Sequence, residues 1–415
     1  MLDIRAAAQK PAEPASSQIL DELAQTAYKA MSSSHQIDST CWRRLYTDAC
    51  LLRSLIDIKN FPKSDDEDIP KSVIERLDCV LIIAGAPGEG RRDLIIDLIS
   101  KIQSECLPSK AFDFSAFHDT SHSDSSQVPS ILTSSGLIPR LSKPPSLIQF
   151  SRQFSQTPFI LPGYAADWPA LNEHPWRSKG YLKSIAGRGR VVPVEVGSDY
   201  RTEDWSQQMM EWDRFLECLD TSPSEKNPIL YLAQHNLLSQ FPALRADIIV
   251  PDYVYTCPAA PSDYPHYRPP GNEHQLVINA WLGPKGTVSP AHTDPYFNFY
   301  VQVVGRKTVW LAPPGATPSM YPYPPPTRSS AVDRRYNPVA NSLEPSMSNT
   351  SRVDVFASPS QVDQTVQQNY PLFWQDVVPE ATSVTLEPGD VLFFPPGWWH
   401  AMRSEETSFS VSMWF

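Results

Sequence analysis

From about residue 151 onward, this chain is a series of short runs of β-branched and aromatic residues separated by turn signals. Each run is short for a helix, and Gly, Pro or Asp follows several of them. The runs are RVVPVEVG (190–197), ILYLAQ (229–234), QLVINAWLG (275–283), FNFYVQVVG (297–305), KTVWLAP (307–313), SVTLEPGD (383–390), VLFFPPG (391–397) and FSVSMWF (409–415). Many short strands of this kind are typical of a β-sandwich or a β-barrel.

The N-terminal part of the chain has a different pattern and predicts a second domain. Leu45, Ala49, Leu52 and Ile56 recur at helical spacing, so we expect an all-α domain before the β-rich one. A stretch rich in Ser and Pro follows and is typical of a flexible or surface linker. The expected divisions are a disordered terminus (1–14), a helical domain (15–107), a linker (108–150) and the β-rich domain (151–415), with a Pro- and Ser-rich insertion at about 314–372.

The sequence GAPGEG, from Gly85 to Gly90, has the glycine spacing of a phosphate-binding loop. Such a loop also needs a lysine for the terminal phosphates and a hydroxyl for magnesium, but Arg91 and Arg92 occupy those two positions. Apolar residues lie at helical spacing on both sides of the turn. We therefore expect a bend between two helices here, and no nucleotide at Gly85–Gly90.

Charge, cysteine usage and hydropathy limit the classes of protein to consider. The formal net charge of −11 disfavours a broad electrostatic attraction to nucleic acid, so we expect no direct nucleic-acid binding. The six cysteines are scattered and form no CxxC pair, which predicts reduced thiols and an intracellular protein. No apolar run reaches membrane-spanning length, so no membrane association is expected.

The clearest chemical signal is the sequence SPAHTDPY, in which His292 and Asp294 are two positions apart. Residues i and i+2 of an extended segment point to the same face, so the imidazole and the carboxylate can bind one metal ion. His400 closes a strand and turn near the C-terminus and offers a third ligand. Two histidines and one carboxylate suit ferrous iron, because they leave positions open for a co-substrate and dioxygen.

Two alternatives to an iron centre stay open at this point, namely a structural role for these residues and a zinc site. Each of these residues taken singly is more often structural than functional, and zinc accepts the same ligands with water at the open position. A zinc-dependent hydrolase on a similar barrel is therefore possible in principle, although we find no separate general base for it. His118, His122 and Asp124 also have ligand-like spacing, but they lie in the Ser-rich linker, and we interpret them as a solvated segment.

The β-rich region resembles the jumonji C (JmjC) family of iron(II)- and 2-oxoglutarate-dependent oxygenases, and within it the lysine demethylase 8 and jumonji-domain arginyl hydroxylase subgroup. The matching sequences are VPVEVGSDYRTEDWSQ, YLAQHNLLSQFP, INAWLGPKGTVSPAHTDPYFNFYVQVVGRK, LEPGDVLFFPPGWWH and SFSVSMWF, and WRRLYTDACLLRSL in the helical part matches more loosely. The resemblance implies a double-stranded β-helix, which is a jelly-roll or cupin-like barrel. It also implies a nuclear location, with the cytoplasm as a further possibility.

The resemblance further implies roles for individual residues. His292, Asp294 and His400 match the iron ligands, which are also the catalytic centre. The residues that match 2-oxoglutarate contacts are Lys307, Asn298, Tyr231 and Ser289; those that match substrate contacts are Glu195, Trp281 and Gln234. If the resemblance is set aside, the sequence suggests structural roles for three of these residues. Lys307 would be a surface lysine in a hairpin, Glu195 an exposed charge on a strand, and Trp281 part of the core.

We therefore expect a dioxygenase with iron(II), 2-oxoglutarate and dioxygen as cofactor and co-substrates, acting on a protein or peptide with a cationic side chain. Glu195 and Trp281 favour arginine hydroxylation, because a carboxylate and an aromatic face together hold a guanidinium. Demethylation of methyl-lysine by the same mechanism is the first alternative, and a non-catalytic binding module on the same barrel is the second. The insertion between His292 and His400 is expected at the barrel rim, where it affects access of substrate.

Overall fold

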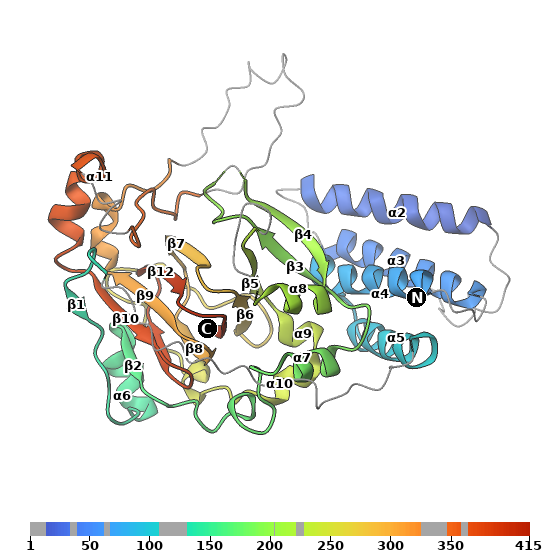
Figure 1. The fold of residues 1–415 in the computed structure, drawn as a ribbon, viewed down its shortest axis with the longest axis horizontal. Coiled ribbons are helices and arrows are strands. Elements are labelled where there is room, and N and C mark those ends of the chain that lie inside the picture. Colours follow the sequence, from blue (N-terminus) through green and yellow to red (C-terminus); the bar gives the residue numbers. More distant parts are fainter. Residues whose placement is uncertain are drawn as a thin grey trace, which may run out of the picture.

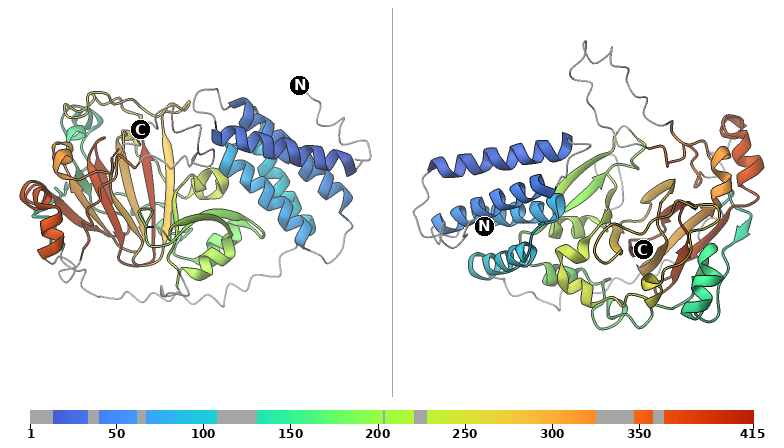
Figure 2. Two further views of the ribbon diagram at one scale, coloured as in Figure 1. Left: turned by 90° about the horizontal axis from the view of Figure 1, so that it is seen from above. Right: turned by 180° about the vertical axis from the view of Figure 1, so that it is seen from behind.

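The structure, a computed structural model, describes residues 14–33, 40–61, 67–107, 131–202, 204–220, 228–324, 347–357 and 364–415. Within these ranges a helical domain lies at one end of the molecule and a β domain of two sheets forms the rest (Figure 1; Figure 2). The predicted fold class, a jelly-roll barrel preceded by an all-α domain, is confirmed. None of the described helices combines the length and the apolar character that crossing a membrane requires.

In the described part of the helical domain, four α-helices pack around one apolar core. They are α2 (Pro14–Ser33), α3 (Thr40–Asn60), α4 (Asp68–Cys79) and α5 (Arg91–Cys106). Ile74 and Leu77 of α4 and Ile95 and Ile99 of α5 are fully buried in this core, as their helical spacing predicts.

The GAPGEG segment is the bend between α4 and α5, so the predicted helix–turn–helix arrangement is confirmed. Helix α4 continues into one turn of π-helix, Val80–Ala84, before the chain reverses. Gly85 and Gly90 both have left-handed backbone angles, with φ of 70° and 66°, which only glycine adopts without strain. The glycines thus serve the reversal of the chain between two helices.

Two sheets form the β domain. The first has strand order β1-β10-β9-β12-β7 and the second β2-β11-β8-β13-β6-β5-β3-β4. The strands are β1 (Gly136–Leu137), β2 (Phe159–Leu161), β3 (Val191–Val196), β4 (Ser206–Glu211), β5 (Leu230–His235), β6 (Val277–Gly283), β7 (Val288–Thr293), β8 (Asn298–Val304), β9 (Lys307–Ala312), β10 (Thr382–Leu386), β11 (Val391–Phe394), β12 (Trp399–Ser404) and β13 (Ser408–Trp414).

Side chains from both sheets meet in the barrel interior, where Tyr300, Leu311 and Leu392 belong to one buried cluster. The outer face of the eight-stranded sheet is buried as well, because alternate residues such as Phe299 and Val301 pack under helices and loops. The covering helices are α6 (Leu147–Arg152), α7 (Lys179–Ala186), α8 (Trp212–Cys218), α9 (Leu237–Gln240) and α10 (Pro242–Ala246); α11 (Gln364–Asn369) lies beside the five-stranded sheet (Figure 1). Burial on both faces explains the nearly continuous apolar runs in the sequence.

Residues 131–150, which the sequence assigns to the linker, contribute elements to the β domain. Strand β1 pairs in parallel with β10, and Ser146 caps α6 by accepting a hydrogen bond from the Gln149 backbone. A serine-rich composition therefore does not by itself identify a segment that packs against nothing. The predicted metal-like cluster His118, His122 and Asp124 lies outside the described residues.

A buried ion pair joins the two domains. Asp78 of α4 accepts hydrogen bonds from the Arg190 guanidinium at 2.7 to 3.0 Å and from the Val191 backbone at 2.9 Å. Gln240 of α9 donates to the same carboxylate and to the Val191 carbonyl. Asp78 is wholly buried and Arg190 is 6% exposed, so neither charge has water as an alternative partner. The pair fixes the helical domain against the start of β3.

Replacing Asp78 by alanine is expected to destabilise the protein by about 3–5 kcal/mol, because it leaves the Arg190 charge buried and unpaired. Chemical denaturation followed by circular dichroism measures this change. Glu67→Ala is the matched control, since Glu67 pairs with Arg188 at the surface and should contribute about 1 kcal/mol or less. Equal small losses in both variants would contradict the assigned role of Asp78.

Candidate metal centre and co-substrate pocket

The structure brings His292, Asp294 and His400 together at one edge of the five-stranded sheet. Strands β7 and β12 are antiparallel neighbours, and their register sets His292 directly opposite His400. The two imidazole rings are 4.2 Å apart between centroids. Asp294 follows β7, and the candidate ligand atoms of the three residues all lie within 4.8 Å of one another. This is the one such group of metal-ligating side chains in the described ranges.

Backbone carbonyls fix the tautomer of both histidines. The Nδ1 atom of His292 lies 2.7 Å from the Pro290 carbonyl oxygen, and that of His400 lies 3.0 Å from the Trp398 carbonyl oxygen. A carbonyl oxygen only accepts, so each Nδ1 carries the proton and donates it. In the neutral imidazoles the lone pairs are then on Nε2, and both Nε2 atoms face Asp294, at 3.9 Å from His292 and 3.4 Å from His400.

The surroundings keep this centre in the protonation state that a metal requires. Burial, with the neighbouring His400, lowers the pKa of His292 to about 4. Burial raises the pKa of Asp294, but the two neighbouring histidines lower it by more, so this pKa lies below its usual value. Two imidazole lone pairs facing a carboxylate repel it unless a cation lies among them, so the donor set fits a divalent metal ion.

A buried lysine lies deeper in the barrel. Lys307, at the start of β9, is 1% exposed, and its Nζ donates to the Tyr300 hydroxyl at 3.0 Å and approaches the Tyr231 hydroxyl at 3.4 Å. No ion pair joins it to a carboxylate within the described residues, and burial lowers its pKa to about 7. An ammonium group without a counter-ion is costly in such a site. The surroundings therefore suit an anionic ligand.

Two other predicted residues lie in the same part of the barrel. Ser289 of β7 hydrogen-bonds Tyr231. Asn298 of β8 is 2% exposed, and its Oδ1 atom has no hydrogen-bond partner within the described chain. A buried amide oxygen without a partner is uncommon, and it marks a position where a ligand or water is expected.

The three predicted substrate residues lie in two different parts of the structure. Glu195 of β3 is paired in register with Tyr231 of β5, and the Tyr231 and Trp281 rings are 6.2 Å apart, so the three residues come from neighbouring strands of one sheet. Burial raises the pKa of Glu195. Gln234 differs: it has a left-handed φ of 49°, interrupts the β5–β6 register, and lines a groove beside the helical domain.

The structure also places three residues at this site that the sequence reading did not identify. Tyr300 shares strand parity with Asn298, so the alternation of β8 could have predicted its inward position. Tyr200 and Thr350 could not be found in this way, because they meet from distant loops. The Tyr200 hydroxyl lies 3.4 Å from the Thr350 hydroxyl, and Thr350 forms a β-bridge with His292.

Comparisons with known proteins agree with this geometry. Residues 146–415 match the family described as a cupin-like domain. Lysine-specific demethylase 8 of Danio rerio is 34% identical over 90% of this chain and 81% of its own length. Jumonji C domain-containing protein 5 of Drosophila melanogaster is 38% identical over 68% of this chain, and lysine-specific demethylase JMJ30 of Arabidopsis thaliana is 36% identical over 62%. The matches cover 61% and 50% of those two relatives.

Removing one ligand should abolish tight metal binding. For His292→Ala we expect affinity for manganese(II), a stable probe for iron(II), to fall at least about 100-fold, because only two ligands remain. Isothermal titration calorimetry measures the affinity without requiring turnover. His274→Ala, at an exposed histidine, is the control and should bind as the unmodified protein does. Unchanged affinity in His292→Ala would refute the assignment of the centre.

Proposed function

Because this chain belongs to the JmjC family of iron(II)- and 2-oxoglutarate-dependent oxygenases, in the lysine demethylase 8 subgroup, we propose that it hydroxylates an arginine side chain of a protein. The observation that supports arginine is the half-buried Glu195, which has no cationic partner in the described chain. It is paired in register with Tyr231, whose ring centroid lies 6.2 Å from that of Trp281. A carboxylate and an indole face suit a planar guanidinium.

In this proposal His292, Asp294 and His400 hold iron(II), and 2-oxoglutarate binds beside it. When bound, iron(II) and 2-oxoglutarate would supply the electrons that activate dioxygen. Lys307, with the Tyr231 and Tyr300 hydroxyls, binds the distal carboxylate, and charge-assisted hydrogen bonds of this kind are the strong ones. Ser289 and Asn298 orient the remaining polar atoms of the co-substrate. The apolar barrel interior keeps water from the reacting groups.

Glu195 and Trp281 position the substrate. The carboxylate would accept hydrogen bonds from the guanidinium while the indole packs on its flat face. The orientation of the Trp281 ring is fixed by a hydrogen bond, because its indole N–H donates to the Ser412 hydroxyl at 2.9 Å. We place Gln234 at the outer end of the substrate path, where its side chain faces the interdomain groove. We also propose the nuclear location that the family implies, which imaging of the tagged full chain would test.

Demethylation of methyl-lysine is the second candidate, because two of the relatives are named lysine-specific demethylases. A methylated ammonium would also suit a carboxylate beside an aromatic ring. Mass spectrometry separates the two reactions. Incubation of arginine and methyl-lysine peptide pools with iron(II), 2-oxoglutarate and ascorbate should add one oxygen to arginine peptides. Loss of methylene groups from lysine peptides alone would favour the demethylase.

Glu195→Gln should raise the KM for an arginine peptide about 10- to 100-fold, because it removes a charged acceptor worth about 1.5–3 kcal/mol. The affinity for 2-oxoglutarate should not change, since Glu195 is not among the groups that contact Lys307. Steady-state kinetics with calorimetry checks both quantities. Glu273→Gln, at an exposed carboxylate, is the control. An unchanged KM in Glu195→Gln would remove Glu195 from the substrate site.

The affinity for 2-oxoglutarate should decrease as the pH rises above 7. Burial lowers the pKa of Lys307 to about 7 in the empty site, and only the protonated amine attracts a carboxylate. The cationic fraction therefore falls up to about tenfold per pH unit above that value, and the affinity with it. Titration of the manganese(II)-loaded protein between about pH 7 and 9 measures the slope. Lys307→Met should bind weakly with no such slope; an equal slope in that variant would contradict the assignment.

A further inference from the structure

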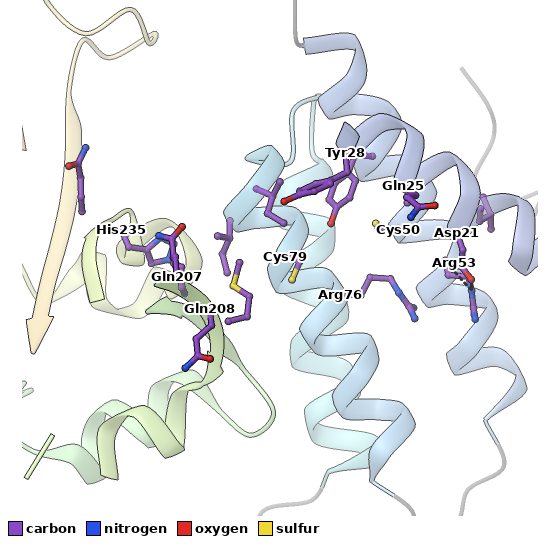
Figure 3. Close-up of a pocket in the computed structure, with 18 of the residues that line it drawn as sticks. Asp21, Gln25, Tyr28, Cys50, Arg53, Arg76, Cys79, Gln207, Gln208 and His235 are labelled. Carbon is purple, nitrogen blue, oxygen red and sulfur yellow. Dashed lines mark hydrogen bonds and ion pairs between the residues drawn. The ribbon is translucent and has the colours of Figure 1, made fainter. Parts of the chain in front are cut away.

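A groove of about 860 Å³ separates the helical domain from strands β4 and β5. Figure 3 shows Gln207 and Gln208 of β4 and His235 of β5 on one side, and Tyr28 and Gln25 of α2 with Cys79 of α4 on the other. The volume is near the upper end of the range for small-molecule sites, about 300–1,000 Å³. Both domains contribute to it, and the buried Asp78–Arg190 pair is one of the contacts that hold them together.

The β4 side of this groove is an unpaired strand edge. The Trp212 backbone N–H donates to the Arg190 carbonyl at 2.8 Å, so Arg190 and Trp212 form a hydrogen-bonded pair of the antiparallel ladder. Such pairs alternate with pairs whose backbone groups point away from each other. The N–H and C=O groups of Gln207, Met209 and Glu211 therefore point outward from β4.

The neighbouring strand supports this assignment. Pro193, opposite Met209, has no backbone N–H. It therefore fits a pair that exchanges no hydrogen bonds across the ladder between β3 and β4. Val191, opposite Glu211, directs its N–H to Asp78 and its C=O to Gln240, away from β4. No backbone hydrogen bond outside the ladders of the described chain uses Gln207 or Met209. A row of free backbone groups of this kind is a template for another extended chain.

The groove lies next to the proposed substrate site. Glu195 is paired in register with Gln207, and Pro193 with Met209, so all four lie on one face of the sheet. Glu195 shares this face with Tyr231 of the barrel interior, while Pro193, Gln207 and Met209 line the groove. Strand β4 also begins just after the loop that carries Tyr200, which contacts Thr350 beside His292. One sheet face therefore leads from the barrel interior into the groove.

The chemistry of the walls suits a polypeptide more than a charged small molecule. The side-chain amides of Gln25, Gln207 and Gln208 form no hydrogen bond with described residues, so their donors and acceptors are available to a peptide backbone. The two arginines of the groove, Arg53 and Arg76, are already neutralised by Asp21 and Asp57. The groove also has apolar walls, against which the side chains of a bound peptide would pack. These walls are formed by Leu20, Tyr28, Ile82, Ile83 and Met209.

We propose that this groove binds the segment of the substrate polypeptide next to the target residue, as an extended strand added to the outer edge of β4. The inference rests on the proposed function for the place of the target side chain at Glu195. It assigns the helical domain a direct part in substrate recognition, with α2 as the wall opposite β4. Main-chain hydrogen bonds to Gln207 and Met209 supply affinity, and side-chain contacts across the groove supply selectivity.

Met209→Pro tests the edge directly. Proline removes the outward N–H of Met209 and leaves the ladder to β3 intact, as prolines on edge strands do. Glu211→Pro is the matched control, because Glu211 has the same strand parity but does not line the groove. Gln25→Trp blocks the groove from α2 without changing β4, and Gln18→Trp, outside the groove on the same helix, is its control. Thermal melting checks that all four variants fold.

The probe is a synthetic pool of peptides with a central arginine and randomised flanks, applied to the immobilised full chain loaded with manganese(II) and 2-oxoglutarate. Quantitative mass spectrometry of the retained peptides should show at least a tenfold loss for Met209→Pro and for Gln25→Trp. The two controls should retain peptides as the unmodified protein does. Equal retention by every variant would overturn the proposal, even if arginine is hydroxylated.

Kinetics with a hydroxylated member of the pool separates this inference from the proposed function. Met209→Pro should raise its KM at least tenfold with kcat nearly unchanged, and should leave the KM of a capped single arginine unaffected. Hydroxylation without this difference would refute the groove and keep the arginyl hydroxylase. Groove-dependent retention without any hydroxylation would keep the groove and refute the arginyl hydroxylase.

Discussion

The pairing of β7 with β12 is the constraint on which the site depends, because it sets His292 opposite His400. One residue of slippage would turn one imidazole to the other face of the sheet. Carbonyls of the same two segments, at Pro290 and Trp398, fix the tautomers, and the β-bridge of Thr350 to His292 covers the outer edge of β7. Backbone register, rather than any side-chain contact, thus determines the geometry of the proposed metal centre.

The interior of the barrel contains polar groups that the folded chain leaves unsatisfied. Lys307 is a buried cation without a carboxylate, and Asn298 has a buried oxygen without a partner. Both are costly for folding, and both lie where a dicarboxylate co-substrate is proposed to bind. Stability is recovered elsewhere, in the aromatic layer around Phe150, Phe299 and Phe393 under the eight-stranded sheet, where these rings lie within 6 Å of one another.

Much of this arrangement follows from local sequence pattern. The spacing of His292 and Asp294, the alternation of β8 and the helical stripes around Gly85–Gly90 each depend on neighbours in the chain, so they are readable from the sequence. The Asp78–Arg190 pair, the contact of Tyr200 with Thr350 and the groove beside β4 depend on segments more than a hundred residues apart. Gln234 was expected as a substrate contact from the resemblance alone, and local pattern did not indicate its left-handed backbone or the shift of the β5–β6 register beside it.

We propose that this chain transfers oxygen from dioxygen to an arginine side chain at the His292–Asp294–His400 centre. Reaction of the iron(II)-loaded protein with 2-oxoglutarate and an arginine peptide under isotopically labelled dioxygen tests it most directly. We expect one labelled atom in the peptide for each labelled succinate released, and neither product from His292→Ala. Succinate formed without label in any peptide, or label in the peptide from His292→Ala, would contradict it.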